Sequence, residues 1–173
     1  ELSSANEKLK HELAERERVE EALRESEERY RSLVAAMAEG IIFVGADGIA
    51  QASNASAQRM LDCPVGQSCL DMCARAIRED GSLLPHEQHP VMVTLQTGEA
   101  QRNVVLGIHR PDGTLMWMLM NTQPLRRPDE TRPHAVVISL LDITERHEAE
   151  EKLRYLSTYD VLTGLYNRAF FEG

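Results

Sequence analysis

The sequence predicts an α+β fold in which a five-stranded antiparallel sheet with short flanking helices lies between two coiled-coil helices. Three observations predict it. A charged heptad pattern without glycine or proline fills residues 1–38. Two short apolar strands, a stretch rich in helix breakers and three longer strands then follow in order. Finally, the last strand runs without a loop into a second charged helical stretch at residues 142–146.

The first stretch has apolar residues at alternating spacings of four and three, which is the seam of a coiled coil. Glu12, Arg16 and Ser26 interrupt this seam. A parallel two-stranded coiled coil and a single solvated helix both remain open, and Gly40 is expected to end the helix. The apolar seam positions are Leu2, Ala5, Leu9, Val19, Leu23, Tyr30, Leu33 and Met37.

Turn and cap residues divide the next part of the chain. Ala46-Asp47-Gly48 predicts a hairpin turn between strands at 41–44 and 49–53, and Asn54 is expected to cap a helix over 55–61. Breakers make 62–88 irregular, with short helical turns such as 70–78. A helix over 90–97 should stop at Gly98.

Three strands are predicted at 101–110, 114–123 and 134–141, separated by a tight turn and a charged surface loop. The middle strand is apolar on both faces, so both faces should be covered. Met116, Met118 and Met120 share one face, and Leu115, Trp117 and Leu119 share the other. After the third strand, Asp142 or Thr144 is placed to cap the following helix.

Composition excludes several classes of protein. The net charge is −9, which argues against a nucleic-acid surface, since phosphate binding needs clustered cations. No apolar run is long enough to span a membrane. The three cysteines, Cys63, Cys69 and Cys73, favour a reducing cytoplasm over a disulfide framework. We expect a cytoplasmic fragment of a longer protein. Whether the parent protein has a membrane anchor upstream of this fragment stays open.

The ordered set of motifs resembles a PAS domain over residues 30–146. The matching pieces are Gly40-Ile41-Ile42-Phe43-Val44 with Asp47-Gly48, Asn54-Ala55-Ser56-Ala57, Arg110-Pro111-Asp112-Gly113 with Trp117, and Asp142-Ile143-Thr144-Glu145-Arg146. The resemblance implies a PAS fold, a sensory and dimerisation role in bacterial signal transduction, and a homodimer formed through the N-terminal helix and the PAS domain.

The last residues resemble the start of a GGDEF domain, the catalytic domain of diguanylate cyclases. The resemblance rests on Asp160-Val161-Leu162-Thr163-Gly164-Leu165-Tyr166-Asn167-Arg168. It implies that Asp160, Thr163, Asn167 and Arg168 anchor that domain, and that the parent makes cyclic di-GMP from two GTP. The GGDEF signature is absent, so the fragment itself is not expected to be an enzyme. The expected parts are residues 1–29, 30–146, 147–158 and 159–173.

A ligand site is expected in the interior, and its occupant is open. His89-Pro90 resembles the iron-ligating position of haem-binding PAS domains, and Trp117 could stack on a flavin; an empty core, or one filled by a small molecule, is the leading expectation. Cys69 and Cys73 could bind metal or sense redox state, but buried small apolar residues are the default. Cofactor-binding candidates are His89, Trp117, Met72, Leu95 and Leu119. Strand alternation adds Ile42, Val44, Met60, Val91, Leu106, Ile108 and Ile138 as lining residues.

The junction after the last strand is the candidate signal-transfer site, through Asp142, Thr144 and Arg146. A ligand, redox change or partner would alter the last strand, and thereby the helix that follows it. A constitutive dimerisation spacer without a ligand is the alternative.

Overall fold

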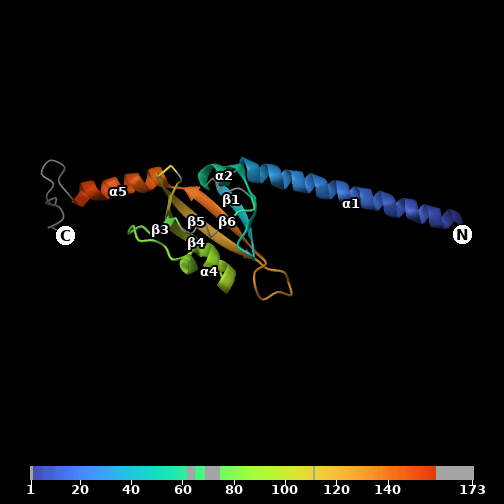
Figure 1. Ribbon diagram of the computed structural model, residues 1–173. Helices are drawn as coiled ribbons and strands as arrows, with labels where there is room; N and C mark the ends of the chain where they lie inside the picture. The colour runs from blue at the N-terminus through green and yellow to red at the C-terminus, as the bar shows by residue number, and fades with distance from the viewer. Residues whose placement is uncertain (1, 62–64, 69–74, 111, 159–173) are drawn as a thin grey trace. The chain divides into compact units, whose positions relative to one another are not determined.

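The computed structural model describes residues 2–61, 65–68, 75–110 and 112–158 (Figure 1). The chain divides into two compact units, with the boundary between Met37 and Ala38. The first unit consists of helix α1 (Leu2–Ala36), and the second holds every strand and the remaining helices.

Helix α1 is continuous over 35 residues and carries ion pairs along its surface, such as Arg16–Glu20 at 2.8 Å. The described apolar residues of the predicted seam are exposed: Val19, Leu23, Tyr30 and Leu33 each expose more than half of their surface. In a single chain, α1 leaves this apolar seam exposed and does not bury it. The coiled coil therefore stays a prediction.

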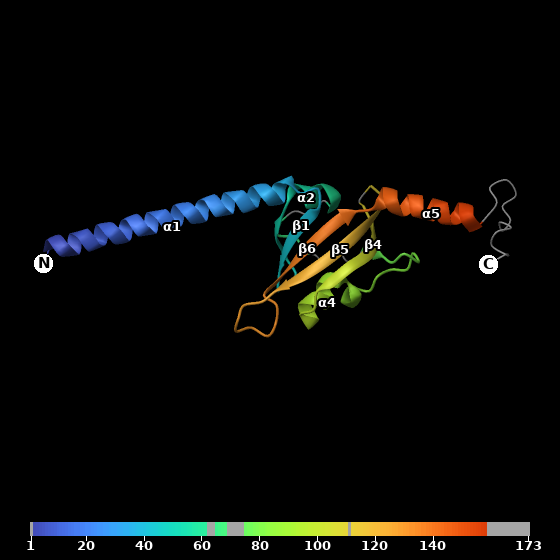
Figure 2. The same cartoon turned by 180° about the vertical axis from the view of Figure 1, so that it is seen from behind.

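The second unit is built on an antiparallel sheet of six strands in the order β2-β1-β6-β5-β4-β3 (Figure 2). Every neighbouring pair runs antiparallel. The strands are β1 (Gly40–Gly45), β2 (Ala50–Ser53), β3 (Ala76–Ile77), β4 (Gln101–His109), β5 (Leu115–Leu125) and β6 (Ala135–Asp142).

Strand β3 corrects the expected five strands and, at Ala76–Ile77, the expected helical turns of 70–78, of which 70–74 lie outside the described residues. Ala76 pairs with Ile108, and Ile77 pairs with Gly107. A Cβ on Gly107 would lie 2.7 Å from Ile77 Cγ1, so the glycine lets the Ile77 side chain lie across β4. This short strand therefore depends on a contact from a distant part of the chain.

Gly40 begins strand β1 instead of ending α1, which is a second correction. A Cβ at Gly40 would lie 3.0 Å from the backbone of Ala57, so the glycine allows β1 to approach helix α2 (Ala55–Leu61) closely. The predicted cap is confirmed, because Asn54 Oδ1 accepts hydrogen bonds from Ala57 N and Ile41 N, both at 2.9 Å. Asn54 thus ties α2 to β1.

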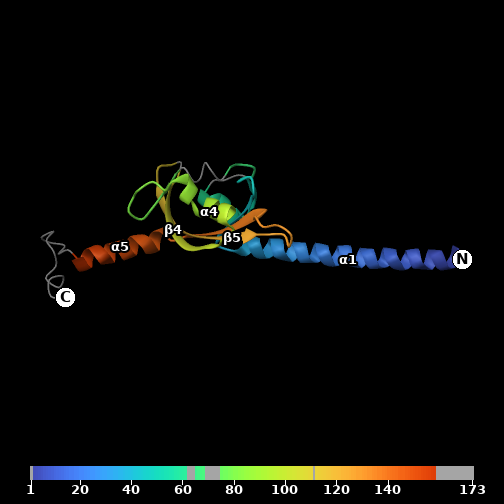
Figure 3. The ribbon, with the colours of Figure 1, turned by 90° about the horizontal axis from the view of Figure 1, so that it is seen from below.

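Helix α4 (Pro90–Thr97) matches its prediction and lies on one side of the sheet (Figure 3). Gly98 ends it in the left-handed conformation, at φ 71°, that glycine adopts without strain. Helices α2 and α4 cover a core of aliphatic side chains and methionines from the strands. The 3₁₀ turn η1 (His86–Gln88) precedes α4, and helix α5 (Thr144–Thr158) follows β6.

Strand β5 places its two apolar faces differently. Met116, Met118 and Met120 are buried in the core beneath the helices. By alternation, Trp117 and Leu119 lie on the other face of the sheet. Their expected place among the interior lining residues is therefore wrong, because the smaller, flexible methionines fill the interior.

Candidate functional site

His89 is the N-cap residue of α4 and is fully buried. Its Nδ1 accepts a long hydrogen bond of 3.4 Å from Val91 N, so the neutral ring carries its proton on Nε2. That Nε2 atom is buried and has no hydrogen-bond partner among the residues that the structure describes. A buried donor without a partner costs free energy, which a ligand with an acceptor atom would recover.

Burial keeps this imidazole neutral. Burial, together with a smaller electrostatic contribution from nearby His86, lowers the pKa of His89 from 6.5 to about 4. A low pKa follows because the interior cannot solvate an imidazolium. His89 is therefore an uncharged hydrogen-bond donor at physiological pH.

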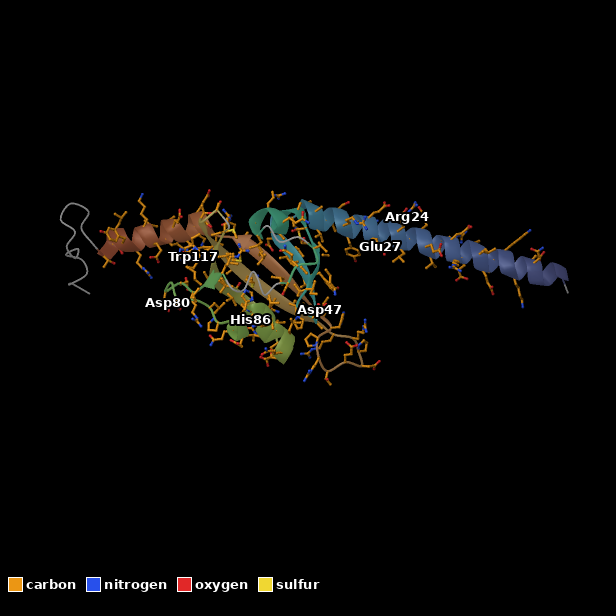
Figure 4. The ribbon with its side chains drawn as sticks, in the orientation of Figure 1. Arg24, Glu27, Asp47, Asp80, His86 and Trp117 are labelled. Carbon is orange, nitrogen blue, oxygen red and sulfur yellow. The ribbon has the colours of Figure 1, made fainter. Side chains whose placement is uncertain are left out.

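A surface cleft of about 460 Å³ lies beside this segment. Its walls come from the β1–β2 turn, η1, the exposed side of α4 and the β5–β6 connection, and include Asp47, His86, Leu95 and Arg132. His86 also has a buried Nε2 atom that finds no hydrogen-bond partner in the described part of the chain. Figure 4 labels Asp47 and His86 from this region.

Helix α4 is joined to β5 by a chain of buried hydrogen bonds. Thr94 Oγ1 donates to Glu99 O at 2.9 Å and lies 2.6 Å from Thr122 Oγ1. Because Thr94 has used its only proton, Thr122 must donate to Thr94, and it accepts from Gln101 N at 3.1 Å. The position of α4 is thereby linked to β5, the strand that is bonded to the start of α5.

At the junction, β6 and α5 are bonded to the Trp117 backbone of β5. Ile143 N donates to Trp117 O at 2.9 Å, and Trp117 N donates to Thr144 Oγ1 at 3.0 Å. The Thr144 hydroxyl and amide both donate to Asp142 Oδ1, at 2.6 and 2.9 Å. The predicted roles of Asp142 and Thr144 in shaping the helix start thus have direct structural contacts.

Two arginines flank the junction with different contacts. Arg110 reaches Asp142 Oδ2 at 3.4 Å and Met116 Sδ at 2.8 Å, so it links the β4–β5 hairpin to the junction. Arg146 instead pairs with Glu150 within α5 at 2.7 Å. The part of Arg146 in signal transfer therefore stays a prediction.

Helix α5 also touches the sheet through a ring stack. The His147 and Trp117 rings have centroids 4.2 Å apart and an interplanar angle of 13°. Figure 4 labels Trp117 at the end of the sheet from which α5 leaves. Trp117 therefore packs against α5 and does not face the interior, which corrects its expected role beside a flavin.

The remaining predicted residues fall into three groups. Ile42, Val44 and Val91 lie in the core with Leu106, Ile108 and Ile138, and Leu95 and Met60 pack against it half-buried. Leu119 lies on the outer face of β5. Met72, the three cysteines and the motif residues Asp160, Thr163, Asn167 and Arg168 lie outside the described residues.

Sequence reasoning missed His147, Arg110 and Glu79, which all contribute to the junction. His147 Nε2 lies 3.7 Å from Glu79 Oε1. These residues come from three segments far apart in the chain, so no local pattern joins them. The only available signal was that His147 follows the helix start by one turn, on the side that faces the sheet.

Comparison with known proteins identifies the domain. The family model described as the PAS fold matches residues 34–148. No GGDEF domain is matched, and no curated protein matches the chain at a significant level. No helix in the described residues is long and apolar enough to cross a membrane.

Solved structures share this fold at low sequence identity. The PAS domain of an HTR-like protein from Haloarcula marismortui is 18% identical, with a TM-score of 0.55, over 73% of this chain and 99% of that one. A sensory box histidine kinase/response regulator from Burkholderia thailandensis is 16% identical, with a TM-score of 0.52, over 73% and 92%.

An RNA-binding light-oxygen-voltage receptor is 21% identical, with a TM-score of 0.54, over 72% of this chain. The match covers only 35% of the receptor, so the chain spans about a third of its length. At these identities the likeness shows the fold alone.

Proposed function

The chain belongs to the PAS fold family, and from this we propose that it is a sensory module whose interior senses a small molecule at His89 and whose helix α5 carries the response to a downstream diguanylate cyclase. The observation that carries the proposal is the set of bonds between Trp117 of β5 and residues 143–144. These hydrogen bonds attach the start of α5 to the sheet at strand β5.

The input side rests on His89. Its buried, neutral imidazole offers one donor in an apolar setting, which suits a mostly apolar ligand with one acceptor atom, such as a carbonyl. Binding would change the position of α4, and the Thr94–Thr122 hydrogen bond passes that change to β5. β5 then meets α5 at Trp117, so one strand joins input to output.

The output side rests on the resemblance of residues 159–168 to the start of a GGDEF domain. Two such domains must face each other to condense two GTP, so the angle of α5 in a dimer would set the rate. A coupling free energy of about 1–3 kcal/mol between the interior and α5 would change output by a factor of about 5 to 150.

The test is a substitution at the junction of the full-length protein. Thr144→Val removes the hydroxyl that joins Trp117 N to Asp142, and we expect cyclic di-GMP output to change about fivefold or more. Thr158→Val is the matched control, because its hydroxyl bonds only Arg154 O within α5. Equal output from the wild type and both variants would contradict the proposal.

Dimerisation through α1 is the second part of the proposal, supported by its exposed apolar seam. Leu23→Glu should lower the sedimentation coefficient of the 173-residue chain toward that of a monomer. Glu25→Gln, on the same helix but outside the seam, should leave it unchanged. A monomeric wild type would refute this part and also the constitutive spacer alternative.

Haem is a second candidate occupant, whose iron would bind Nε2 of His89 after the ring proton moved to Nδ1 and the hydrogen bond from Val91 N was given up. Neutral imidazole is a common haem ligand, and bound iron would supply sensitivity to gases or redox state. An absorbance spectrum from roughly 300 to 600 nm separates haem and flavin from a colourless ligand. A flat spectrum from protein grown with both cofactors, with a small molecule found by native mass spectrometry, would support the colourless ligand.

A further inference from the structure

The surface cleft beside α4 is held in shape by the backbone of two connections. At the β1–β2 turn, Gly48 N donates to Gly45 O at 2.9 Å. Ala46 N donates to His134 O at 3.0 Å, so the β5–β6 connection ends beside this turn. The two connections therefore keep a fixed place relative to each other. The cleft that they line together with η1 and α4 has a volume of about 460 Å³, which is large enough for a small molecule.

Helix α4 supplies the apolar wall of the cleft. Met92, Leu95 and Gln96 line it, and their spacing of three and four residues places them on one face of the helix. Met92 and Leu95 are half-buried, so each keeps apolar surface in contact with solvent. A ligand with an apolar part would remove this surface from water, which is favourable.

The cleft also holds one carboxylate and one guanidinium, which do not pair. Asp47 Oδ1 accepts a hydrogen bond from Ile49 N at 3.0 Å, which is its role in the turn. Among the described residues, Asp47 and Arg132 form no ion pair with each other or with any other side chain. Two opposite charges are thus available to a ligand in the same cleft.

We propose that this cleft binds a small zwitterion with an apolar body, of the class of apolar α-amino acids and short apolar peptides. The ammonium group of the ligand faces Asp47. Its carboxylate faces Arg132, whose planar guanidinium donates two parallel hydrogen bonds to a carboxylate. Its apolar part lies against Met92 and Leu95.

The pair of charges selects against other classes of ligand. An anion without an ammonium group would bring its negative charge into the cleft that holds the Asp47 carboxylate, and a cation without a carboxylate would leave Arg132 without a partner. The site lies on the exposed side of α4, whereas His89 is buried. It is therefore separate from the interior ligand of the proposed function and does not rest on it.

The first experiment is isothermal titration calorimetry of the 173-residue chain with leucine and with the dipeptide leucyl-leucine. We expect a Kd of about 1 mM or lower for at least one of them. Tighter binding of leucine identifies a free amino acid as the ligand, and tighter binding of the dipeptide identifies a short peptide. N-acetylation or amidation removes one charge of the ligand, and glycine or diglycine lacks the apolar part. Each of these changes should weaken binding about tenfold or more.

Substitutions that remove one charge then locate the ligand in the cleft. Asp47→Asn keeps an acceptor for Ile49 N, so the turn is retained, and it should lose most of the preference for the free ligand over the N-acetylated one. Arg132→Gln should lose most of the preference for the free ligand over the amidated one. Asp129→Asn and Arg127→Gln, at exposed residues of the β5–β6 connection outside the cleft, are the matched controls and should bind as the wild type does.

Far-ultraviolet circular dichroism of each variant should match that of the wild type. If Asp47→Asn or Arg132→Gln does not fold, the N-acetylated and amidated ligands test the same two contacts on the wild-type chain. Absence of binding by both leucine and leucyl-leucine would overturn the proposal. So would equal affinity for the charged and the blocked ligands, which would show that the charges of the cleft do not recognise the ligand.

Two further results would place the ligand elsewhere and overturn the proposal. One is unchanged binding by both Asp47→Asn and Arg132→Gln, as expected of a ligand in the interior. The other is an equal loss of affinity in the two control variants, as expected of an effect of net charge alone. The site and the proposed function can fail separately. If binding depends on Asp47 while cyclic di-GMP output does not respond to Thr144→Val, the site stands and the proposed function fails.

Discussion

His89 should make the stability of the domain depend on pH in a way that one substitution removes. Burial lowers its folded pKa to about 4, below the ordinary value of 6.5. The unfolded chain therefore takes up a proton first as the pH falls below 6.5, which favours unfolding. The stability associated with neutral His89 is complete above pH 6.5 and is lost as the pH falls toward 4.

The magnitude follows from the two pKa values. Between pH 7.5 and pH 4.5, the linkage relation gives a loss of about 2–3 kcal/mol for this single group. His89→Asn keeps a side-chain acceptor for Val91 N but cannot titrate. Subtracting the two curves removes the contributions of groups that do not interact with His89.

The assay is urea unfolding followed by far-ultraviolet circular dichroism at several pH values. Wild-type stability should fall about 2–3 kcal/mol more than that of His89→Asn between pH 7.5 and pH 4.5. His109→Asn, at an exposed histidine, should follow the wild type. Parallel curves for wild type and His89→Asn would show that His89 is not held neutral by burial, and the reasoning would fail.

Three further substitutions test the fold by the same urea assay. Asn54→Ala should cost about 2 kcal/mol, because the cap of α2 and the bond to Ile41 N are lost together; Asn54→Asp, which keeps the acceptor, should cost less. Met118→Ala should cost about 2–5 kcal/mol by leaving a cavity, whereas Leu141→Ala, at a side chain 39% exposed, should cost less than half as much. Gly98→Ala should cost about 1 kcal/mol or more, because its φ of 71° strains any residue with a Cβ; a stabilised variant would contradict that conformation.

Local chemistry made much of the fold predictable. Asn54 before a short apolar helix and Gly98 after another are signals read within a few residues, and both ends lie where the signals placed them. Strand β3 was not predictable in this way. Its two residues pair with Ile108 and Gly107, about thirty positions later, and only the missing Cβ of Gly107 makes room.

In the candidate site too, residues with local partners were predictable and residues with distant partners were not. Asp142 and Thr144 were predicted because a short polar side chain at a helix start has a local partner. The side of the sheet on which Trp117 lies was not predictable, because β5 is apolar on both faces and alternation does not show which face is interior. That depends on His147, which is 30 residues away and covers one face only.

The hydrogen-bond chain through Thr94 and Thr122 has a consequence for how α4 moves. Every donor in it points one way, from Gln101 N through both hydroxyls to Glu99 O. A partial slide of α4 along β5 would lengthen the central 2.6 Å bond and leave both hydroxyls poorly paired in a buried site, where the cost is high. We therefore expect α4 to occupy discrete positions along β5, with few molecules at positions between them. The domain should respond to the proposed ligand by switching between discrete states and not by a graded displacement of α4.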